Sequence, residues 1–215
     1  MKRYIRSAVR SMSDESRDVR MEMAATPDSI LRPSVLKELA GDEDLYVRCA
    51  LAANINCPIE VLKQLMNDEN PSVRYEVVGN PNITPEMLGI LAEDPDWAVR
   101  REVAYTLKTP ISTLVKLSND PSANVLEAVA TNKNTPVEIL RELADKDEAN
   151  IRMRVASNQN TPQDVLIKLA EDPRHTVRLW VAKNKSAPKD TLYQLASDPD
   201  DLVQHYAAEA LRWAL

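Results

Sequence analysis

Six arginines recur along the chain at nearly regular spacing, and a column of cations of this kind is able to bind phosphate groups. A helical wheel, however, places each arginine inside the buried arc of its helix. A buried arginine needs an anionic partner, and a column of aspartates with the same period supplies candidates. The arginines are Arg20, Arg48, Arg74, Arg100, Arg152 and Arg178, and the aspartates are Asp42, Asp68, Asp94, Asp120, Asp172 and Asp198.

Defects in the two columns distinguish two pairing schemes. If each arginine paired within its own repeat, Asp120 would face Leu126, and Lys146 would face Arg152. If each arginine reaches the aspartate of the next repeat, every arginine is matched, and Gln204 stands in the last repeat, which has no successor. We therefore expect a structural ladder, not an anion-binding surface, with the pairs Arg20–Asp42, Arg48–Asp68, Arg74–Asp94, Arg100–Asp120, Arg152–Asp172 and Arg178–Asp198.

Catalytic motifs are absent from the sequence. It has no Gly-rich phosphate loop, no H-E-x-x-H, no G-x-S-x-G and no paired C-x-x-C. His175 and His205 lie in different repeats, and Cys49 and Cys57 provide no disulfide framework. We therefore predict no catalytic residue, no cofactor and no metal site, and a protein that is not an enzyme.

Short helices are the elements that must position these columns. A pair of leucines at a spacing of three returns every 26 residues, and a valine column after each pair begins a second segment with helical spacing. Self-similarity at such a period is typical of stacked arrays. We predict an all-α, right-handed α-solenoid of about seven to eight two-helix repeats. The leucine pairs are Leu36/Leu39, Leu62/Leu65, Leu88/Leu91, Leu114/Leu117, Leu140/Leu143, Leu166/Leu169 and Leu192/Leu195.

Thr-Pro pairs, such as Thr84-Pro85 and Thr135-Pro136, precede the leucine segments. A threonine oxygen accepts hydrogen bonds from the free N–H groups of a first helical turn, and proline suits the first helical position. Carboxylates three residues after threonine, at Glu138 and Asp164, resemble a capping box. We expect threonine caps on these helices, and we expect an asparagine column to close the second helices and bind loop backbone.

The repeated motif resembles that of the leucine-rich repeat variant family, an all-helical solenoid. The resemblance covers nearly the whole chain through Thr-Pro, Leu-x-x-Leu-Ala, Asp-Pro and Val-Arg-x-x-Val-Ala-x-Asn. The motif is also similar to HEAT repeats in its aspartate and Val-Arg spacing, although its period is shorter. A family relative suggests an iron–sulfur cluster on an N-terminal cysteine group. This sequence lacks that group, so the resemblance implies no cofactor here.

Composition agrees with a soluble scaffold. The chain has 215 residues, is 44% hydrophobic and carries a formal net charge of −6, so it can bury a continuous core. We expect one continuous solenoid domain, with an N-terminal capping repeat at 1–32, a repeat array at 33–201 and a C-terminal capping helix at 202–215. No apolar run approaches signal-peptide or transmembrane length, which favours a cytoplasmic location and no membrane contact.

Three columns on the outward arc of the second helices vary between repeats, whereas packing makes the other columns repeat. They hold aromatic, Met and Arg side chains, which are enriched at protein interfaces. The sequence therefore predicts a non-enzymatic scaffold that binds a protein or peptide through this face, with Trp180 as the anchor. The candidate partner-binding residues are Tyr75, Arg101, Tyr105, Met153, Arg154, Leu179, Trp180, His205 and Tyr206.

A nucleic-acid-binding or DNA-repair module of HEAT-like type is the alternative function, by analogy of fold. A surface that tracks phosphates is basic, but the three variable columns hold fewer cations than glutamates, so nucleic acid is not the expected partner. The alternative would have to use the basic N-terminus, which contains Lys2, Arg3, Arg6 and Arg10.

The end of the chain has no eighth leucine pair to cover its final helix. Solenoids need a polar outer cap, and this segment supplies only part of one. We expect either that Trp213 folds back onto the last repeat or that the C-terminal helix joins a second copy in an end-to-end homodimer.

Overall fold

The computed structural model describes residues 16–26 and 33–213, apart from the side chain of Trp213. These residues form fifteen α-helices and no strand. The chain divides into two compact units, residues 1–102 and 103–215. None of the described helices combines the length and the apolar character that crossing a membrane requires.

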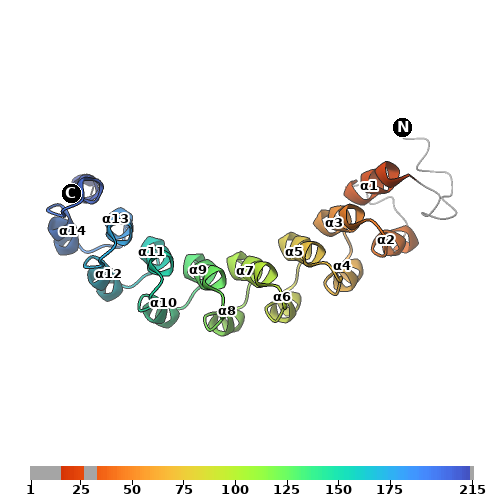
Figure 1. The fold of residues 1–215 in the computed structure, drawn as a ribbon, viewed down its shortest axis with the longest axis horizontal. Coiled ribbons are helices and arrows are strands. Elements are labelled where there is room, and N and C mark those ends of the chain that lie inside the picture. The colour runs from red at the N-terminus through yellow and green to blue at the C-terminus, as the bar shows by residue number, and fades with distance from the viewer. Residues whose placement is uncertain (1–15, 27–32, 214–215) are drawn as a thin grey trace. The chain divides into compact units, whose positions relative to one another are not determined.

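In the N-terminal unit, alternate helices form two rows (Figure 1). One row holds α1, α3 and α5, and the other holds α2, α4 and α6. Each odd-numbered helix packs against the next one in its row. The bounds are α1 Arg17–Ala25, α2 Pro33–Leu39, α3 Leu45–Ala53, α4 Ile59–Leu65, α5 Pro71–Gly79, α6 Pro85–Leu91 and α7 Trp97–Tyr105, in which the unit ends.

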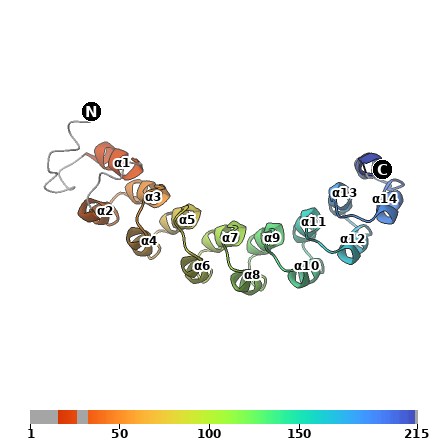
Figure 2. The ribbon, with the colours of Figure 1, turned by 180° about the vertical axis from the view of Figure 1, so that it is seen from behind.

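The C-terminal unit repeats this arrangement (Figure 2). Helices α9, α11 and α13 form one row, α8, α10, α12 and α14 form the other, and α15 packs against both α13 and α14. The bounds are α8 Ile111–Leu117, α9 Ala123–Thr131, α10 Val137–Leu143, α11 Ala149–Ser157, α12 Gln163–Leu169, α13 His175–Lys183, α14 Lys189–Leu195 and α15 Asp201–Trp213.

Leucine and valine side chains fill the space between the two rows of each unit. The valines Val47, Val73, Val125 and Val177 and the leucines Leu62, Leu88, Leu140 and Leu166 are fully buried. Even-numbered helices such as α4 have 7 residues and odd-numbered helices such as α3 have 9, lengths that are marginal in water for an isolated helix. The repeats are therefore stable through stacking, and the fold is the predicted α-helical solenoid.

Threonine caps were the wrong expectation for most of these helices. Thr84 does accept from the Met87 N–H at the start of α6. In contrast, α8, α10 and α12 begin after a proline without any side-chain cap, so no capping box forms there. The buried threonine hydroxyls donate instead to carbonyl groups of the preceding odd-numbered helix, because they face its last turn. These bonds are Thr109 to Val103, Thr135 to Val129 and Thr161 to Val155.

Asparagines at the ends of the odd-numbered helices join each repeat to the one before. Asn80 Nδ2 donates to the carbonyl oxygens of Ala52 and Asn54, at 2.6 and 2.9 Å. Asn80 Oδ1 accepts from the Asn82 N–H of its own loop. The column thus binds loop backbone as predicted, and it also reaches across to the preceding repeat. The same pair of bonds to the preceding repeat recurs at Asn54, Asn132, Asn158 and Asn184.

Five ladder arginines contact the aspartate of the next repeat. Arg74 Nε and Nη2 donate to the two carboxylate oxygens of Asp94, at 2.6 and 2.7 Å, and the two side chains are 11% and 3% exposed. Such bidentate pairs are among the stronger hydrogen bonds in proteins. The sixth predicted pair links residues of the two units and stays a prediction. The five pairs are Arg20–Asp42, Arg48–Asp68, Arg74–Asp94, Arg152–Asp172 and Arg178–Asp198.

Four of these arginines, Arg48, Arg74, Arg152 and Arg178, also bind the turn of their own repeat. Arg152 Nη1 donates to the carbonyl oxygen of Lys146 at 2.8 Å. Because the acceptor is a backbone carbonyl oxygen, the bond is present even at position 146, where lysine replaces the column aspartate. Gln204, in the last repeat, keeps the own-repeat bond through the carbonyl oxygen of Asp198. These arginines therefore bind a carboxylate of the next repeat and a backbone carbonyl oxygen of their own repeat.

Several expectations remain open. The boundaries at 1–32, 33–201 and 202–215 stay a prediction, as does the single continuous domain. The Trp213 side chain, on which both proposals for the C-terminal end depend, lies outside the described residues. The same is true of the basic N-terminal residues Lys2, Arg3, Arg6 and Arg10.

Removal of one ladder arginine should destabilise the protein. Arg74→Ala leaves the buried Asp94 carboxylate without its two guanidinium donors, so we expect a loss of about 1–3 kcal/mol in the free energy of unfolding, measured by urea denaturation. Arg141→Ala is the control, because its ion pair with Asp164 is exposed and should contribute no more than about 1 kcal/mol. Equal effects of the two substitutions would contradict a structural role for the ladder.

The last ladder pair should make stability depend on pH. The hydrogen bond from Arg178 holds the pKa of Asp198 below its ordinary value of 3.8. A carboxyl group with a lowered folded-state pKa stabilises the fold above its unfolded-state pKa, and this contribution is lost as the pH falls through the folded-state value. The gap in unfolding free energy between wild type and Asp198→Asn should therefore narrow below about pH 4. A gap that is constant down to about pH 2 would contradict the linkage.

Candidate binding surface

The nine candidate residues all lie on odd-numbered helices, but they belong to both units. Tyr105 and His205 are exposed, whereas the other seven side chains are half-buried. The sequence suggested more exposure, but adjacent odd-numbered helices pack side by side and cover part of each other's outward face. The residues are Tyr75 on α5, Arg101 and Tyr105 on α7, Met153 and Arg154 on α11, Leu179 and Trp180 on α13, and His205 and Tyr206 on α15.

In the C-terminal unit, Lys183 links the aromatic rings of two helices. Its ammonium nitrogen lies 5.3 Å from the ring centre of Trp180 and 3.9 Å from that of Tyr206. Both distances are within the range of cation–π attraction. The ring of His205 packs edge-on against Tyr206, with 5.3 Å between the centres. The structure therefore brings Trp180, Tyr206 and His205 into one cluster around Lys183, a residue that was not among the predicted candidates.

Arg154 lies on α11, one repeat before this cluster. Its Nε atom is 3.6 Å from Glu127 Oε2, and this nitrogen is buried without a hydrogen bond. Arg154, Trp180 and Tyr206 occupy equivalent positions of three consecutive odd-numbered helices, as the repeat period predicts. This row, together with Lys183, is called the aromatic row below.

The N-terminal unit contains a separate, more acidic group of side chains. A hydrogen bond to Glu102 raises the pKa of Tyr75, and Arg101 also bonds this hydroxyl. The Arg101 guanidinium lies over the ring of Trp97, 5.4 Å from its centre. Burial, followed by repulsion from Glu102, raises the pKa of Glu76. Tyr75 and Arg101 thus form a network with Glu102 and Trp97 that is separate from the cluster around Lys183.

The two cysteines differ in burial. Cys49 is half-buried and Cys57 is buried, and neither forms a disulfide. Burial raises the pKa of the Cys57 thiol to about 12. A thiol with so high a pKa carries almost no thiolate near pH 7, so Cys57 is a packing residue.

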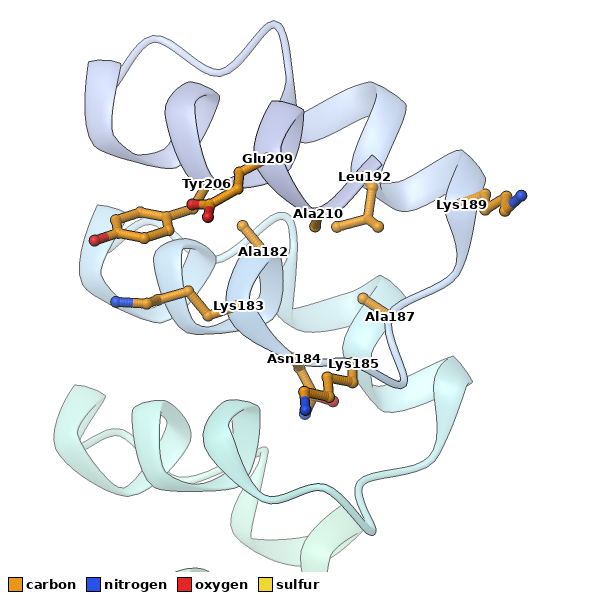
Figure 3. A pocket seen from close by; sticks show the side chains of 10 residues that line it. All are labelled: Ala182, Lys183, Asn184, Lys185, Ala187, Lys189, Leu192, Tyr206, Glu209 and Ala210. Carbon is orange, nitrogen blue, oxygen red and sulfur yellow. The ribbon is translucent and has the colours of Figure 1, made fainter. Parts of the chain in front are cut away.

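A groove of about 650 Å³ borders the aromatic row (Figure 3). Lys183 and Tyr206 lie together at one end of it and Lys189 lies at the opposite end. Sequence reasoning missed this groove. The available signal was alanine at positions 187 and 210, where other repeats hold threonine and asparagine. The lining residues are Ala182, Lys183, Asn184, Lys185, Ala187, Lys189, Leu192, Tyr206, Glu209 and Ala210.

Sequence reasoning also missed apolar side chains on the even-numbered helices of the C-terminal unit. Tyr193 on α14 is 61% exposed, whereas Arg154, Trp180 and Tyr206 are half-buried. The signal was the variable position directly after the first leucine of each pair, which holds Val115, Arg141, Ile167 and Tyr193. Arg141 of this column pairs with Asp164, and Tyr193 has no cation–π contact among the described residues, unlike Tyr206.

Comparison with known structures finds other helical repeat proteins. A leucine-rich repeat variant, described as having a novel repetitive structural motif, is 30% identical over 90% of this chain and 81% of that chain, with a TM-score of 0.63. The Escherichia coli protein YibA is 14% identical over 92% and 97% of the two chains, with a TM-score of 0.51, which shows the fold alone. No protein-family model and no curated protein matches the sequence.

Neutralising Glu76 should stabilise the N-terminal unit. A carboxyl group whose pKa is raised by folding opposes folding when it is ionised, and this cost disappears as the pH falls and the group is protonated. We expect Glu76→Gln to raise the urea midpoint at neutral pH and to have a smaller effect near pH 4. Glu60→Gln, at an exposed position of α4, is the control for loss of one negative charge. A larger gain from the control would contradict this account.

Proposed function

The chain belongs to the leucine-rich repeat variant family, and we propose that it is a non-enzymatic scaffold that binds a protein or peptide through the aromatic row of its C-terminal unit. Membership of a helical repeat family supports this, because stacked repeats present extended surfaces that bind other chains. A fold does not determine function by itself, so the proposal depends on the composition and geometry of the row.

The observation that carries the proposal is the cluster of Trp180, Tyr206 and Lys183. Equivalent positions on α3 and α9 hold the small residues Ala50 and Ala128, so packing between repeats does not require an indole there. Trp, Tyr and Arg are the residues that most often dominate the energy of protein interfaces. A half-buried ring that is already held by a neighbouring cation also loses little side-chain freedom on binding.

The outer residues of the surface surround this centre. Met153 and Leu179 supply apolar area beside Arg154 and Trp180, and His205 lies beside Tyr206 at the far end. We assign Tyr105, which is exposed at the end of α7, to the rim of the same surface. Tyr75 and Arg101 are proposed as a separate contact area on the N-terminal unit.

Trp180→Ala should abolish most partner binding. We expect recovery of the bound partner from a lysate, quantified by mass spectrometry, to fall by at least about tenfold, as for an interface residue at the centre of its contact. The matched control is Tyr193→Ala, which removes a more exposed aromatic ring from the other row of the same unit. Circular dichroism and the urea midpoint show whether both variants fold.

Two results would contradict the proposal. One is partner recovery that is unchanged in Trp180→Ala and reduced in Tyr193→Ala, which would move the surface to the even-numbered helices. The other is binding of duplex DNA that requires the N-terminal cations, Lys2, Arg3, Arg6 and Arg10, which would favour a nucleic-acid-binding module.

A further inference from the structure

The groove beside the aromatic row lies where the last repeat differs from the three repeats before it at two positions. Threonine donates to a carbonyl of the preceding helix at 109, 135 and 161, but the corresponding residue 26 positions later is Ala187. Asparagine occupies the column at 132, 158 and 184, but position 210 is alanine. Both alanines line the groove. Two side chains that bond the backbone in earlier repeats are therefore replaced by methyl groups.

These replacements remove side-chain donors that earlier repeats supply to backbone acceptors. Asn184 Nδ2 donates to the carbonyl oxygens of Ala156 and Asn158, at 2.7 and 2.9 Å. The equivalent carbonyl oxygens one repeat later belong to Ala182 and Asn184, and Ala210 has no side-chain donor for them. The Asn184 carbonyl oxygen still accepts from the Ala187 N–H at 3.0 Å, and Ala182 and Asn184 are both buried. The two alanines therefore take side-chain volume out of the groove without exposing these carbonyl oxygens to a ligand.

Helix α15 prevents the chain from restoring the usual arrangement. The earlier odd-numbered helices of the unit, α9, α11 and α13, each end directly before the column asparagine. In contrast, α15 has 13 residues and continues through Ala210. The backbone at position 210 is therefore helical, where Asn132, Asn158 and Asn184 have extended dihedral angles.

The charge of the groove differs from that of the chain. Its lining holds three lysines, Lys183, Lys185 and Lys189, against the single carboxylate of Glu209, although the whole chain has a net charge of −6. Lys183 and Lys189 lie at opposite ends, so the cations are spread along the groove (Figure 3). Spread cations around an apolar floor of Ala187, Leu192 and Ala210 match a short extended segment with several carboxylates better than a single small anion.

From this arrangement we infer that the groove between α13 and α15 binds an acidic peptide segment of the partner. Carboxylates of the segment pair with Lys183, Lys185 and Lys189, and the rest of the segment lies over the apolar floor of Ala187, Leu192 and Ala210. The groove volume is within the range of ligand-binding clefts. The inference rests on the proposed function, because Lys183 and Tyr206 belong to both surfaces and make the groove a continuation of the aromatic row.

Defined peptide pools test the inference on the full chain. Three fluorescein-labelled hexapeptide pools carry glutamate, glutamine or lysine at alternate positions and all other residues except cysteine between them. Fluorescence anisotropy is recorded at about 50 mM and about 500 mM salt, because screening weakens contacts between exposed charges. We expect the glutamate pool to bind at least about tenfold more tightly than the other two pools, and to weaken at high salt.

Matched variants locate the binding. Lys185→Gln should weaken binding of the glutamate pool, whereas Lys133→Gln, at the same loop position two repeats earlier, should not. The triple variant Lys183→Gln, Lys185→Gln and Lys189→Gln should lose at least about tenfold in affinity. Ala210→Asn, which narrows the groove without changing its charge, should also weaken binding. The urea midpoint of each variant separates loss of binding from loss of folding.

The outcomes distinguish this inference from the proposed function. Preference for the glutamine or lysine pool, with loss of binding in Trp180→Ala, overturns the acidic ligand and leaves the scaffold in place. Binding of the glutamate pool that is equal in Lys185→Gln and Lys133→Gln overturns the groove as its site. A third outcome is that no pool binds, that the wild type is a dimer in sedimentation velocity, and that the triple lysine variant is a monomer. This outcome assigns the groove to a second copy and also overturns the inference.

Discussion

Hydrogen bonds that cross from one repeat to the next hold this fold together, because its helices are too short to be stable alone. Leucine and valine provide the burial, but they do not specify which part of one repeat lies against which part of the next. Arg74 on Asp94, and Asn80 on the carbonyls of Ala52 and Asn54, supply this specificity. Each such side chain donates hydrogen bonds to buried acceptors of the neighbouring repeat.

The repeat that ends in α15 differs from those before it. Gln204 stands at the position of the ladder arginines and retains the bond to its own turn through the carbonyl oxygen of Asp198. Ala187 and Ala210 remove two further bonds, and a groove lined with lysines takes their place. The repeat that ends in α15 is thus the one whose lysines and apolar side chains line a groove that is suited to another chain.

The surface columns follow a different logic from the structural ones. A position such as Val177 is the same in nearly every repeat because the space between the rows is the same. Positions 128, 154, 180 and 206 hold alanine, arginine, tryptophan and tyrosine, which no common packing requirement would select. The variation places aromatic rings and Lys183 in the C-terminal unit, and it places Glu76 and Glu102 in the N-terminal unit, where Glu76 has a raised pKa.

The sequence by itself determined the fold, because the strict period of 26 residues shows which positions are equivalent. It also determined the direction of the Arg–Asp pairing, because the defects at Leu126 and Lys146 show which two columns must match. It also predicted that Arg154, Trp180 and Tyr206 occupy equivalent positions, since a variable position inside a strict repeat is visible without coordinates, but it did not single out Lys183. Only the tertiary structure decided where Thr135 and Asn184 direct their hydrogen bonds, and that Ala187 and Ala210 together form a groove. The physical reason is that a period shows which residues are equivalent, whereas the partner of a polar group depends on which backbone atom the stacking of two repeats brings opposite to it.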